Sequence, residues 1–211
     1  MKYGPDKFSI FPNAKLKELC FIKNTITRKN IEVGDYTYFD DKNGADKFED
    51  HVTHHYDFIG DKLIIGKFCS IASGIEFIMN GANHNMSGFS TYPFNIFGNG
   101  WEKVVPQIKD LPIKGDTVVG NDVWFGQNVT VLPGVKIGDG AIIGANAVVA
   151  SDIPAYSVAV GNPCRVVKKR FDDKTIAALE KIQWWNWDEK KIFDNLEIIV
   201  GNDIDKLIKC H

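Results

Sequence analysis

The chain has 211 residues, 44% of them hydrophobic, which is enough for one domain with its own core and a small appendage. Its formal net charge is −2 with acids and bases mixed along the sequence, whereas a nucleic-acid partner would require a basic face. No apolar run approaches the ~20 residues of a membrane span, and the first 13 residues lack the apolar core of a signal peptide. We therefore expect a cytoplasmic protein with no membrane or nucleic-acid partner. The cysteines have neither CxxC spacing nor a dense framework, as is typical of reduced thiols: Cys20, Cys69, Cys164 and Cys210.

A six-residue period organises most of the chain. A fragment at Val33-Gly34 resembles an isolated first turn, and the pattern then recurs at Ile65-Gly66, Ile71-Ala72 and Phe77. After a long interruption, six large apolar residues follow in the same phase: Val119, Phe125, Val131, Ile137, Ile143 and Val149. Four of them precede a glycine, which we expect to permit the torsions of a corner. Sandwich strands would instead show a period of two.

This period predicts a triangular solenoid. Each hexapeptide forms a short strand and a corner, and three hexapeptides form a coil that stacks ~4.8 Å above its neighbour, with the large apolar residue inside. Such solenoids coil left-handedly, against the usual crossover preference. The predicted fold is mainly β, a left-handed parallel β-helix over residues 1–170.

Two segments break the repeat. Residues 78–118 are rich in Gly, Asn, Pro and aromatic residues, which is typical of a functional loop excursion. Residues 171–211 change to a helical pattern, in which Asp172 or Asp173 can cap a helix that Phe171 staples. Within this C-terminal helical appendage, we expect Trp184-Trp185-Asn186-Trp187 to anchor packing rather than to form a sugar or base platform.

The histidines offer one candidate general base. His84 lies where the repeat breaks, and an imidazole with a pKa near 6.5 can accept a proton at neutral pH. A satisfied loop histidine is the alternative. His51, His54 and His55 have metal-binding spacing only on a helix, and their surroundings indicate a loop, so no metal site is expected. A β-helix carbonic anhydrase would need histidines on its coils, and residues 119–163 contain none.

Six segments together carry a family resemblance that covers nearly the whole chain. They are Ile65–Ile71, Ile78–His84, Ser90–Phe94, Gly120–Trp124, Pro133–Ala141 and Gly161–Pro163. The chain resembles the xenobiotic acetyltransferases of the hexapeptide-repeat superfamily, most closely the virginiamycin (streptogramin A) branch, with type B chloramphenicol acetyltransferases as relatives. It departs from the family pattern at Asn85 and Ser87, where an arginine and an acid are often found, and Phe89 lengthens the next turn. These departures bear on the acceptor more than on acetyl transfer.

The resemblance implies an enzyme that moves an acetyl group from acetyl-CoA to a hydroxyl of a streptogramin A antibiotic and so inactivates it. It implies a homotrimer with active sites between subunits, and His84 as the catalytic base. The acetyl-CoA groove corresponds to Trp124, Gly144, Ala145, Gly161, Asn162, Pro163 and the basic cluster Lys168, Lys169 and Arg170. The acceptor pocket corresponds to Tyr38, Tyr56 and the loop from Phe94 to Leu111, which includes Phe97 and Trp101.

We expect direct transfer without an acyl-enzyme, because no Cys or Ser is visibly paired with His84. The basic cluster offers charge-assisted contacts to CoA phosphates, with a solvated surface as the alternative. Two other functions remain open. One is a transferase with another acceptor, such as chloramphenicol, a sugar or an amino compound. The other is a non-enzymatic β-helix subunit that binds or scaffolds.

Overall fold

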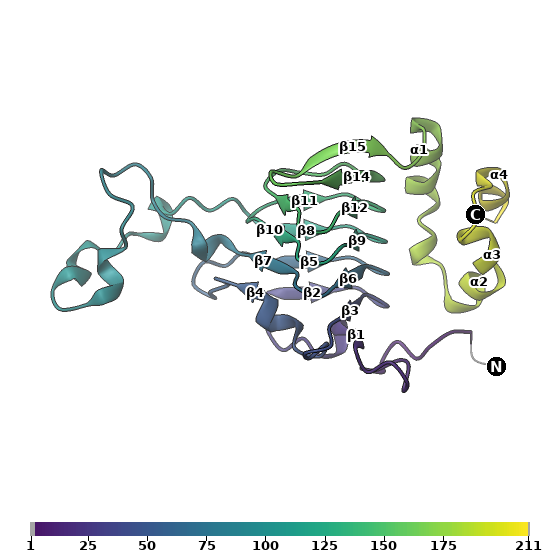
Figure 1. The fold of residues 1–211 in the computed structure, drawn as a ribbon, viewed down its shortest axis with the longest axis horizontal. Coiled ribbons are helices and arrows are strands. Elements are labelled where there is room, and N and C mark those ends of the chain that lie inside the picture. Colours follow the sequence, from purple (N-terminus) through teal and green to yellow (C-terminus); the bar gives the residue numbers. More distant parts are fainter. Residues whose placement is uncertain (1–2, 211) are drawn as a thin grey trace.

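The computed structural model describes residues 3–210, and its body is a parallel β-helix with three sheets (Figure 1). Sheet 1 contains, in spatial order, β1 (Leu19–Phe21), β3 (Tyr38–Asp40), β6 (Ser70–Ala72), β9 (Trp124–Phe125), β12 (Ile142–Ile143), β14 (Ser157–Val160) and β15 (Arg165–Lys169). Sheet 2 contains β4 (Val52–Thr53), β7 (Glu76–Ile78), β10 (Thr130–Val131) and β13 (Val148–Val149). Sheet 3 contains β2 (Ile31–Val33), β5 (Leu63–Ile65), β8 (Thr117–Val119) and β11 (Lys136–Ile137). The chain visits sheets 3, 1 and 2 in turn on every coil.

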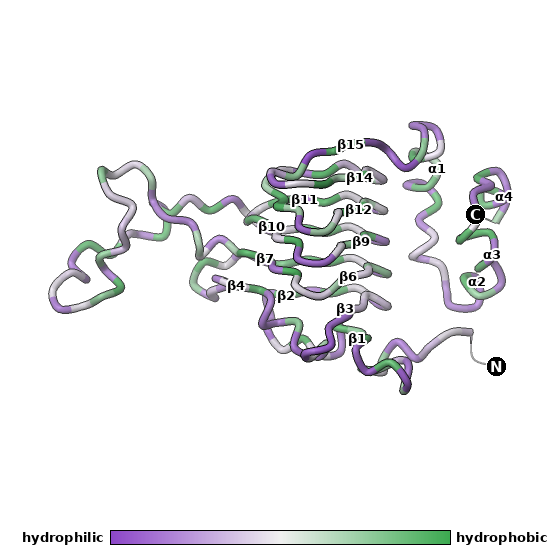
Figure 2. Tube along the Cα trace, viewed as in Figure 1, coloured by the Kyte–Doolittle hydropathy of each residue, from purple (hydrophilic) through white to green (hydrophobic). Residues whose placement is uncertain are grey.

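The strand register confirms the predicted phase of the repeat. Val119 pairs with Ile137, Phe125 with Ile143, and Val131 with Val149, so partners lie three hexapeptides apart. All six of these side chains are at most 2% exposed and belong to one core. Figure 2 shows hydrophobic residues recurring on each successive coil. The strands are parallel except at the two ends of sheet 1, where β1 runs antiparallel to β3 and β15 antiparallel to β14.

The expected reason for the repeat glycines was wrong. Gly120 and Gly138 do not have the positive φ angles that favour glycine. A β-carbon at Gly120 would instead lie 2.7 Å from the backbone nitrogen of Asp139, and one at Gly138 would lie 2.4 Å from that of Ala155. Close stacking of one coil on the next therefore requires the glycine. The left-handed torsion falls two residues later, for example at Asp122.

The long excursion spans residues 79–116, between β7 and β8, two residues shorter at its C-terminal end than predicted and one at its N-terminal end. Its regular structure is limited to the 3₁₀ turns η3 (Asn80–Ala82), η4 (Phe94–Phe97), η5 (Trp101–Val104) and η6 (Ile108–Asp110). It leaves the body at the corner between sheets 2 and 3 and projects far from the coils (Figure 1). Two further 3₁₀ turns lie closer to the N-terminus, at η1 (Ile22–Asn24) and η2 (Phe48–His51). His51 thus ends a short turn, where a loop was expected.

The C-terminal helices cover the corner between sheets 3 and 1. They are α1 (Asp173–Ile182), η7 (Trp184–Asn186), α2 (Glu189–Asp194), α3 (Leu196–Ile199) and α4 (Ile204–Lys209). The Asp172 side chain accepts a hydrogen bond from the Thr175 N–H, as expected of an N-cap. Trp185, 2% exposed, belongs to a second apolar cluster with Tyr156 of the coil. The tryptophan segment therefore anchors packing. Within residues 3–210, no helix is long and apolar enough to cross a membrane.

Candidate active site

His84 lies on the outgoing arm of the excursion, just beyond η3, and is exposed. Its Nδ1 atom is 2.8 Å from the backbone carbonyl oxygen of Thr91. Because a carbonyl oxygen can only accept, this bond requires the hydrogen on Nδ1, which leaves the lone pair of a neutral imidazole on Nε2. The second nitrogen is therefore prepared to accept a proton, as a general base must.

The other described histidines lie on the coils, outside the excursion. His51 Nδ1 lies 2.9 Å from the carbonyl oxygen of Ile75, and His55 Nε2 lies 2.9 Å from that of Asp61. His54 has a left-handed backbone conformation. These three rings do not share a ligand position, and among residues 3–210 no group of three or more His, Cys, Asp or Glu residues could hold a metal ion. His211 lies outside the described residues.

The excursion gathers three of the predicted acceptor-contacting side chains. Phe94 and Trp101 pack edge to face with ring centroids 5.2 Å apart, and Phe97 packs edge to face against Trp101 at 6.5 Å. Tyr92, which the sequence did not single out for this role, stacks on Phe97 at 5.2 Å. These four rings, which we call the aromatic cluster, are 40% to 50% exposed. Leu111 lies apart from them, near the returning end of the excursion, and is partly buried.

Tyr56 lies against the beginning of the excursion. A β-carbon at Gly81 would lie 2.4 Å from the Tyr56 ring and 2.4 Å from the carbonyl oxygen of His54, so only glycine allows this approach. Tyr56 also stacks on Phe58, with ring centroids 5.5 Å apart. Tyr56 therefore shares a corner of the β-helix with the segment that carries His84.

Tyr38 and Trp124 lie on sheet 1 instead. The register aligns one row of residues across this sheet, namely Tyr38, Ser70, Trp124, Ile142, Val158 and Lys168. Trp124 is 55% exposed, and Tyr38 is partly buried. Two residues predicted to bind different substrates thus lie along one outer face, separated by a single strand.

The remaining groove residues share the corner between sheets 1 and 2. Gly144 and Ala145 follow β12, and residues 161–163 follow β14, where the Gly161 carbonyl accepts from the Val148 N–H at 3.0 Å. A β-carbon at Gly144 would lie 2.7 Å from a methyl carbon of Val160. Gly161, Asn162 and Pro163 are exposed. The spacing of the repeat thus stacks residues that are far apart in the sequence.

The basic cluster divides into paired and free cations. Arg170 donates to the carbonyl oxygen of Gly140 at 2.6 Å and lies 3.7 Å from the Asp122 carboxylate, and Lys169 pairs with Asp173. Burial raises the pKa of Asp122 to about 6, although the positive charge of Arg170 acts in the opposite direction. Among residues 3–210, no ion pair engages the Lys168 side chain. Of the three cations, Lys168 is therefore the most available to a phosphate.

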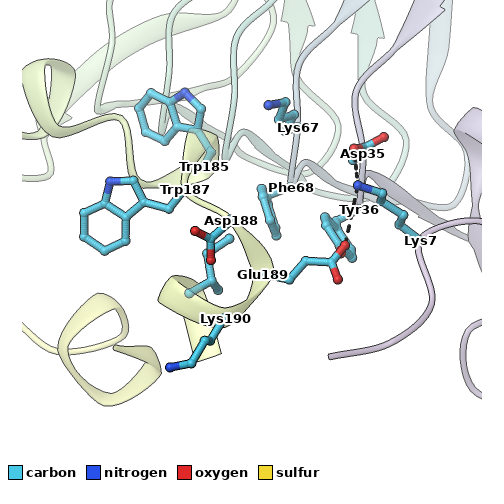
Figure 3. A pocket seen from close by; sticks show the side chains of 11 residues that line it. Lys7, Asp35, Tyr36, Lys67, Phe68, Trp185, Trp187, Asp188, Glu189 and Lys190 are labelled. Atoms are coloured by element: carbon cyan, nitrogen blue, oxygen red, sulfur yellow. Dashed lines mark hydrogen bonds and ion pairs between the residues drawn. The ribbon is translucent and has the colours of Figure 1, made fainter. Parts of the chain in front are cut away.

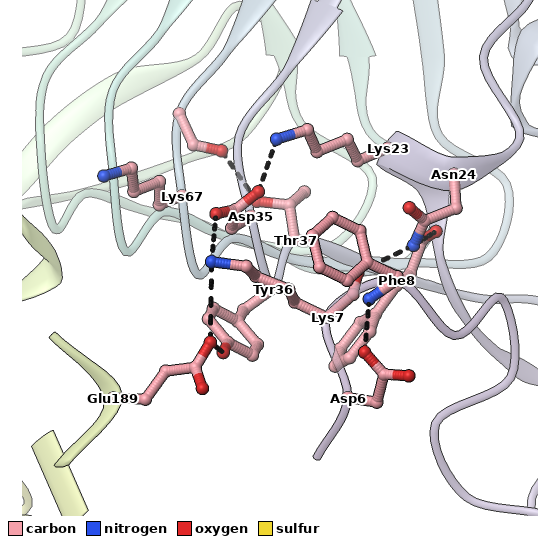
Figure 4. Close-up of polar contacts among 12 residues, drawn as sticks. Asp6, Lys7, Phe8, Lys23, Asn24, Asp35, Tyr36, Thr37, Lys67 and Glu189 are labelled. Atoms are coloured by element: carbon pink, nitrogen blue, oxygen red, sulfur yellow. Dashed lines mark hydrogen bonds and ion pairs between the residues drawn. The ribbon is translucent and has the colours of Figure 1, made fainter. Parts of the chain in front are cut away.

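A pocket of about 450 Å³ lies elsewhere, between the first coils and α2, and contains none of the predicted site residues (Figure 3). Figure 4 shows the polar contacts beside it. The Lys7 ammonium is 3.5 Å from both Asp35 and Glu189, Tyr36 donates to Glu189 at 2.7 Å, and Lys23 also pairs with Asp35. These contacts fasten the N-terminal segment and α2 to the first coil.

The predicted site residues therefore form two groups on different corners of the β-helix. His84, Tyr56 and the aromatic cluster belong to the excursion and its corner between sheets 2 and 3. The predicted acetyl-CoA residues, and with them Tyr38, lie on sheet 1 and at its corner with sheet 2. Arg170 is the exception, because it lies at the corner between sheets 3 and 1 beside Gly140 and Asp122. Sequence reasoning did not assign a role to Asn80 and Asp61, which are both 3% exposed and join the excursion to the coil.

Comparison with known proteins identifies a family and several similar acetyltransferases. A family model described as bacterial transferase hexapeptide (six repeats) matches residues 116–151. A Staphylococcus aureus protein named virginiamycin A acetyltransferase is 56% identical over 205 residues, covering 97% of this chain and 93% of its own length. A Lysinibacillus sphaericus protein named "Probable macrolide acetyltransferase" is 64% identical over 162 residues, covering 77% of this chain and 90% of its own. A chloramphenicol acetyltransferase of Agrobacterium fabrum is 37% identical over 187 residues, covering 85% and 87%.

Proposed function

The chain belongs to the hexapeptide-repeat family of xenobiotic acetyltransferases, and from that premise we propose that it transfers the acetyl group of acetyl-CoA to a hydroxyl of a streptogramin A antibiotic. The observation that carries the acceptor is the 56% identity, over nearly the whole chain, to a protein named virginiamycin A acetyltransferase. Identity to the chloramphenicol acetyltransferase is much lower, at 37%. The exposed aromatic cluster supports the same choice, because a large macrocycle needs broad apolar contact.

The proposed chemistry depends on the tautomer of His84. Its Nε2 lone pair accepts the proton of the acceptor hydroxyl as that oxygen attacks the thioester carbonyl. When the tetrahedral intermediate collapses, the carbon–sulfur bond breaks, and His84 returns the proton to the departing CoA thiolate. The hydrogen bond from Nδ1 to the Thr91 carbonyl oxygen holds the ring and fixes the tautomer that leaves the lone pair on Nε2.

We propose a homotrimer of left-handed β-helices with each site between two subunits. The separation of the predicted site residues onto two corners supports this assembly, because the excursion of one chain can reach the groove of the next. In this arrangement the neighbouring chain supplies the acetyl-CoA residues on sheet 1, with Lys168 toward the phosphates. We retain residues 1–170 as the β-helix domain and 171–211 as its appendage, and propose a cytoplasmic location, where acetyl-CoA is made.

The function is tested by measuring turnover of the purified protein, with the released CoA thiol as the signal. Streptogramin A should give the highest kcat/KM, with chloramphenicol and simple amines far below it. His84→Ala should lose ~10²-fold or more in kcat while binding acetyl-CoA normally. His51→Gln is the matched control, because His51 also bonds a backbone carbonyl through Nδ1. Equal turnover of chloramphenicol would overturn the acceptor, and full activity of His84→Ala would remove the base.

A further inference from the structure

The excursion is held to the coil at its root, defined here as residues 79–84 on the outgoing arm and 112–116 on the returning arm. The Asn80 side chain lies between these arms. Its Nδ2 donates to Asp61 Oδ2 at 2.7 Å and to the Gly115 carbonyl oxygen at 2.8 Å, and its Oδ1 accepts from the Lys114 N–H at 2.7 Å. Asn83 Nδ2 lies 3.3 Å from the same Oδ1. One amide therefore joins both arms to each other and to the coil.

Asn80 has no unused hydrogen-bonding capacity. An amide side chain offers two donors and two acceptor lone pairs, and the root uses all four. Asp61 Oδ2 also accepts from the Asn80 backbone N–H at 2.9 Å. Both residues are 3% exposed, so water cannot replace a lost bond without rearrangement of the root.

Asp61 gives this arrangement a fixed point on the β-helix. It lies two residues before β5, and its carbonyl oxygen accepts from the buried His55 ring at 2.9 Å. The next residue, Lys62, accepts from the Thr117 N–H at 2.9 Å at the start of the following coil. The root is therefore fastened to two successive coils rather than to a mobile connection.

The position of His84 depends on the same root. Asn83, its neighbour, also donates to the Pro112 carbonyl oxygen at 3.1 Å. Beyond His84, the hydrogen bonds found for residues 85–111 in the described structure stay within the excursion. The bond from His84 Nδ1 to the Thr91 carbonyl oxygen orients the ring within the excursion, and the root joins that segment to the coils. A displacement of about 1 Å at a reacting group can cost ~10²-fold in rate, so the root matters for His84.

We propose that Asn80 is a positioning residue, which acts with Asp61 to hold His84 where its Nε2 meets the acceptor hydroxyl. This inference rests on the proposed function of His84 as the base. It assigns Asn80 no contact with either substrate. A purely structural role would instead make Asn80 a determinant of folding, with active molecules that work at the normal rate.

Three variants separate these roles. Asn80→Asp keeps the shape but removes both donors and places a second carboxyl against Asp61. Asp61→Asn removes the acceptor charge. In the exchanged pair, Asn80→Asp with Asp61→Asn, the new amide donates to the new carboxylate, which restores the link from residue 80 to the coil, whereas the bond to the Gly115 carbonyl oxygen stays lost. Asn24→Asp is the matched control, because Asn24 Nδ2 donates to the Lys7 carbonyl oxygen at 2.9 Å, far from the excursion (Figure 4).

For positioning, each single variant should lower kcat for streptogramin A by ~10- to 100-fold. The KM for acetyl-CoA and the stoichiometry of CoA binding per chain should stay unchanged. The exchanged pair should regain part of the lost kcat, because only the bond between residues 80 and 61 is remade. Lower pH should reduce the loss of kcat in Asn80→Asp, since two adjacent carboxyls share a proton and the protonated carboxyl can donate a hydrogen bond. The ratio of its kcat to that of wild type should therefore rise from pH 8 to pH 6. Asn24→Asp should match wild type.

Unchanged kcat in Asn80→Asp, or a loss of kcat that only follows a loss of CoA-binding stoichiometry, would overturn the proposal. Failure of the proposed function has a different signature, because wild type itself would then fail to acetylate streptogramin A. In that case ¹⁵N spectra of histidine-labelled protein still decide the question. Positioning requires the Nδ1–H signal of His84 to change in Asn80→Asp and to shift back toward its wild-type position in the exchanged pair, and an unaltered signal would refute it.

Discussion

Replacing Ile137 by aspartate tests the phase of the repeat at a single side chain. Ile137 is 2% exposed in β11, and its backbone pairs with Val119 on one side and Ile153 on the other. Removing a buried isoleucine side chain costs ~2–5 kcal/mol, because fixed coils above and below prevent the cavity from collapsing. The new carboxyl has no partner in the core and takes up a proton rather than staying charged. A rise of about 3 pKa units adds ~4 kcal/mol at pH 7.

The expected total, roughly 6 kcal/mol or more, is comparable to the whole stability of a typical domain. Urea unfolding at a fixed protein concentration measures it, since subunit association contributes to the midpoint. The loss should grow between pH 4 and pH 8, because a carboxyl whose pKa is raised on folding destabilises the folded state as pH rises. Lys136→Gln, one residue earlier and exposed, should change stability by about 0.5 kcal/mol or less. Equal midpoints for the two variants would refute the inward orientation of Ile137.

Three further expectations follow from other contacts. Gly81→Ala should lower kcat and stability, because its β-carbon would lie 2.4 Å from a backbone oxygen and 2.4 Å from a tyrosine ring. Gly88→Ala, whose β-carbon would have 3.4 Å of clearance, should have little effect, and equal kcat and melting temperatures of the two variants would contradict this. Lys168→Ala should raise the KM for acetyl-CoA at low salt, and this difference from wild type should shrink at high salt. Arg170→Ala should mainly lower the melting temperature, because Arg170 is bonded within the chain, and the reverse pattern would contradict both assignments. Because the pKa of Asp122 is raised to about 6, wild type should lose stability relative to Asp122→Asn as pH rises from 4 to 6, and parallel melting curves would exclude this.

The periodic part of the fold could be predicted because each hexapeptide repeats the same physical requirement. An inward apolar residue at every sixth position predicted the side chains that fill the core, from Val119 to Val149. The reason for the glycines could not be found this way. Corner torsion and close stacking both favour glycine, and only the neighbouring coil shows that stacking decides at Gly120.

The candidate site likewise contains residues that could be predicted from the sequence and residues that could not. His84 and the aromatic residues could be singled out from chemistry, position and resemblance. The link between Asp61 and Asn80 could not, because Asp61 lies outside the repeat and its partner is determined by how the root folds back. The pairing of Arg170 with Asp122 could not be predicted either, because the two residues are far apart in the sequence and meet only in the folded chain. Three adjacent cations suggest one phosphate site. In the structure, Arg170 and Lys169 pair with carboxylates of this chain, and Lys168 has no such ion pair among the described residues.

The reversed strands at the two ends of sheet 1 have a consequence for colloidal behaviour. A stack of parallel coils ends in unpaired N–H and C=O groups, which can template another chain and lead to fibres. Here β1 and β15 run antiparallel to the strands they cover, so the next molecule meets the wrong polarity for continuing the coil. The outer strand β15 also carries Arg165, Lys168 and Lys169, and like charges repel a second copy of the same edge. On this face of the solenoid the parallel stacking therefore ends at β1 and β15, which opposes end-to-end growth through sheet 1.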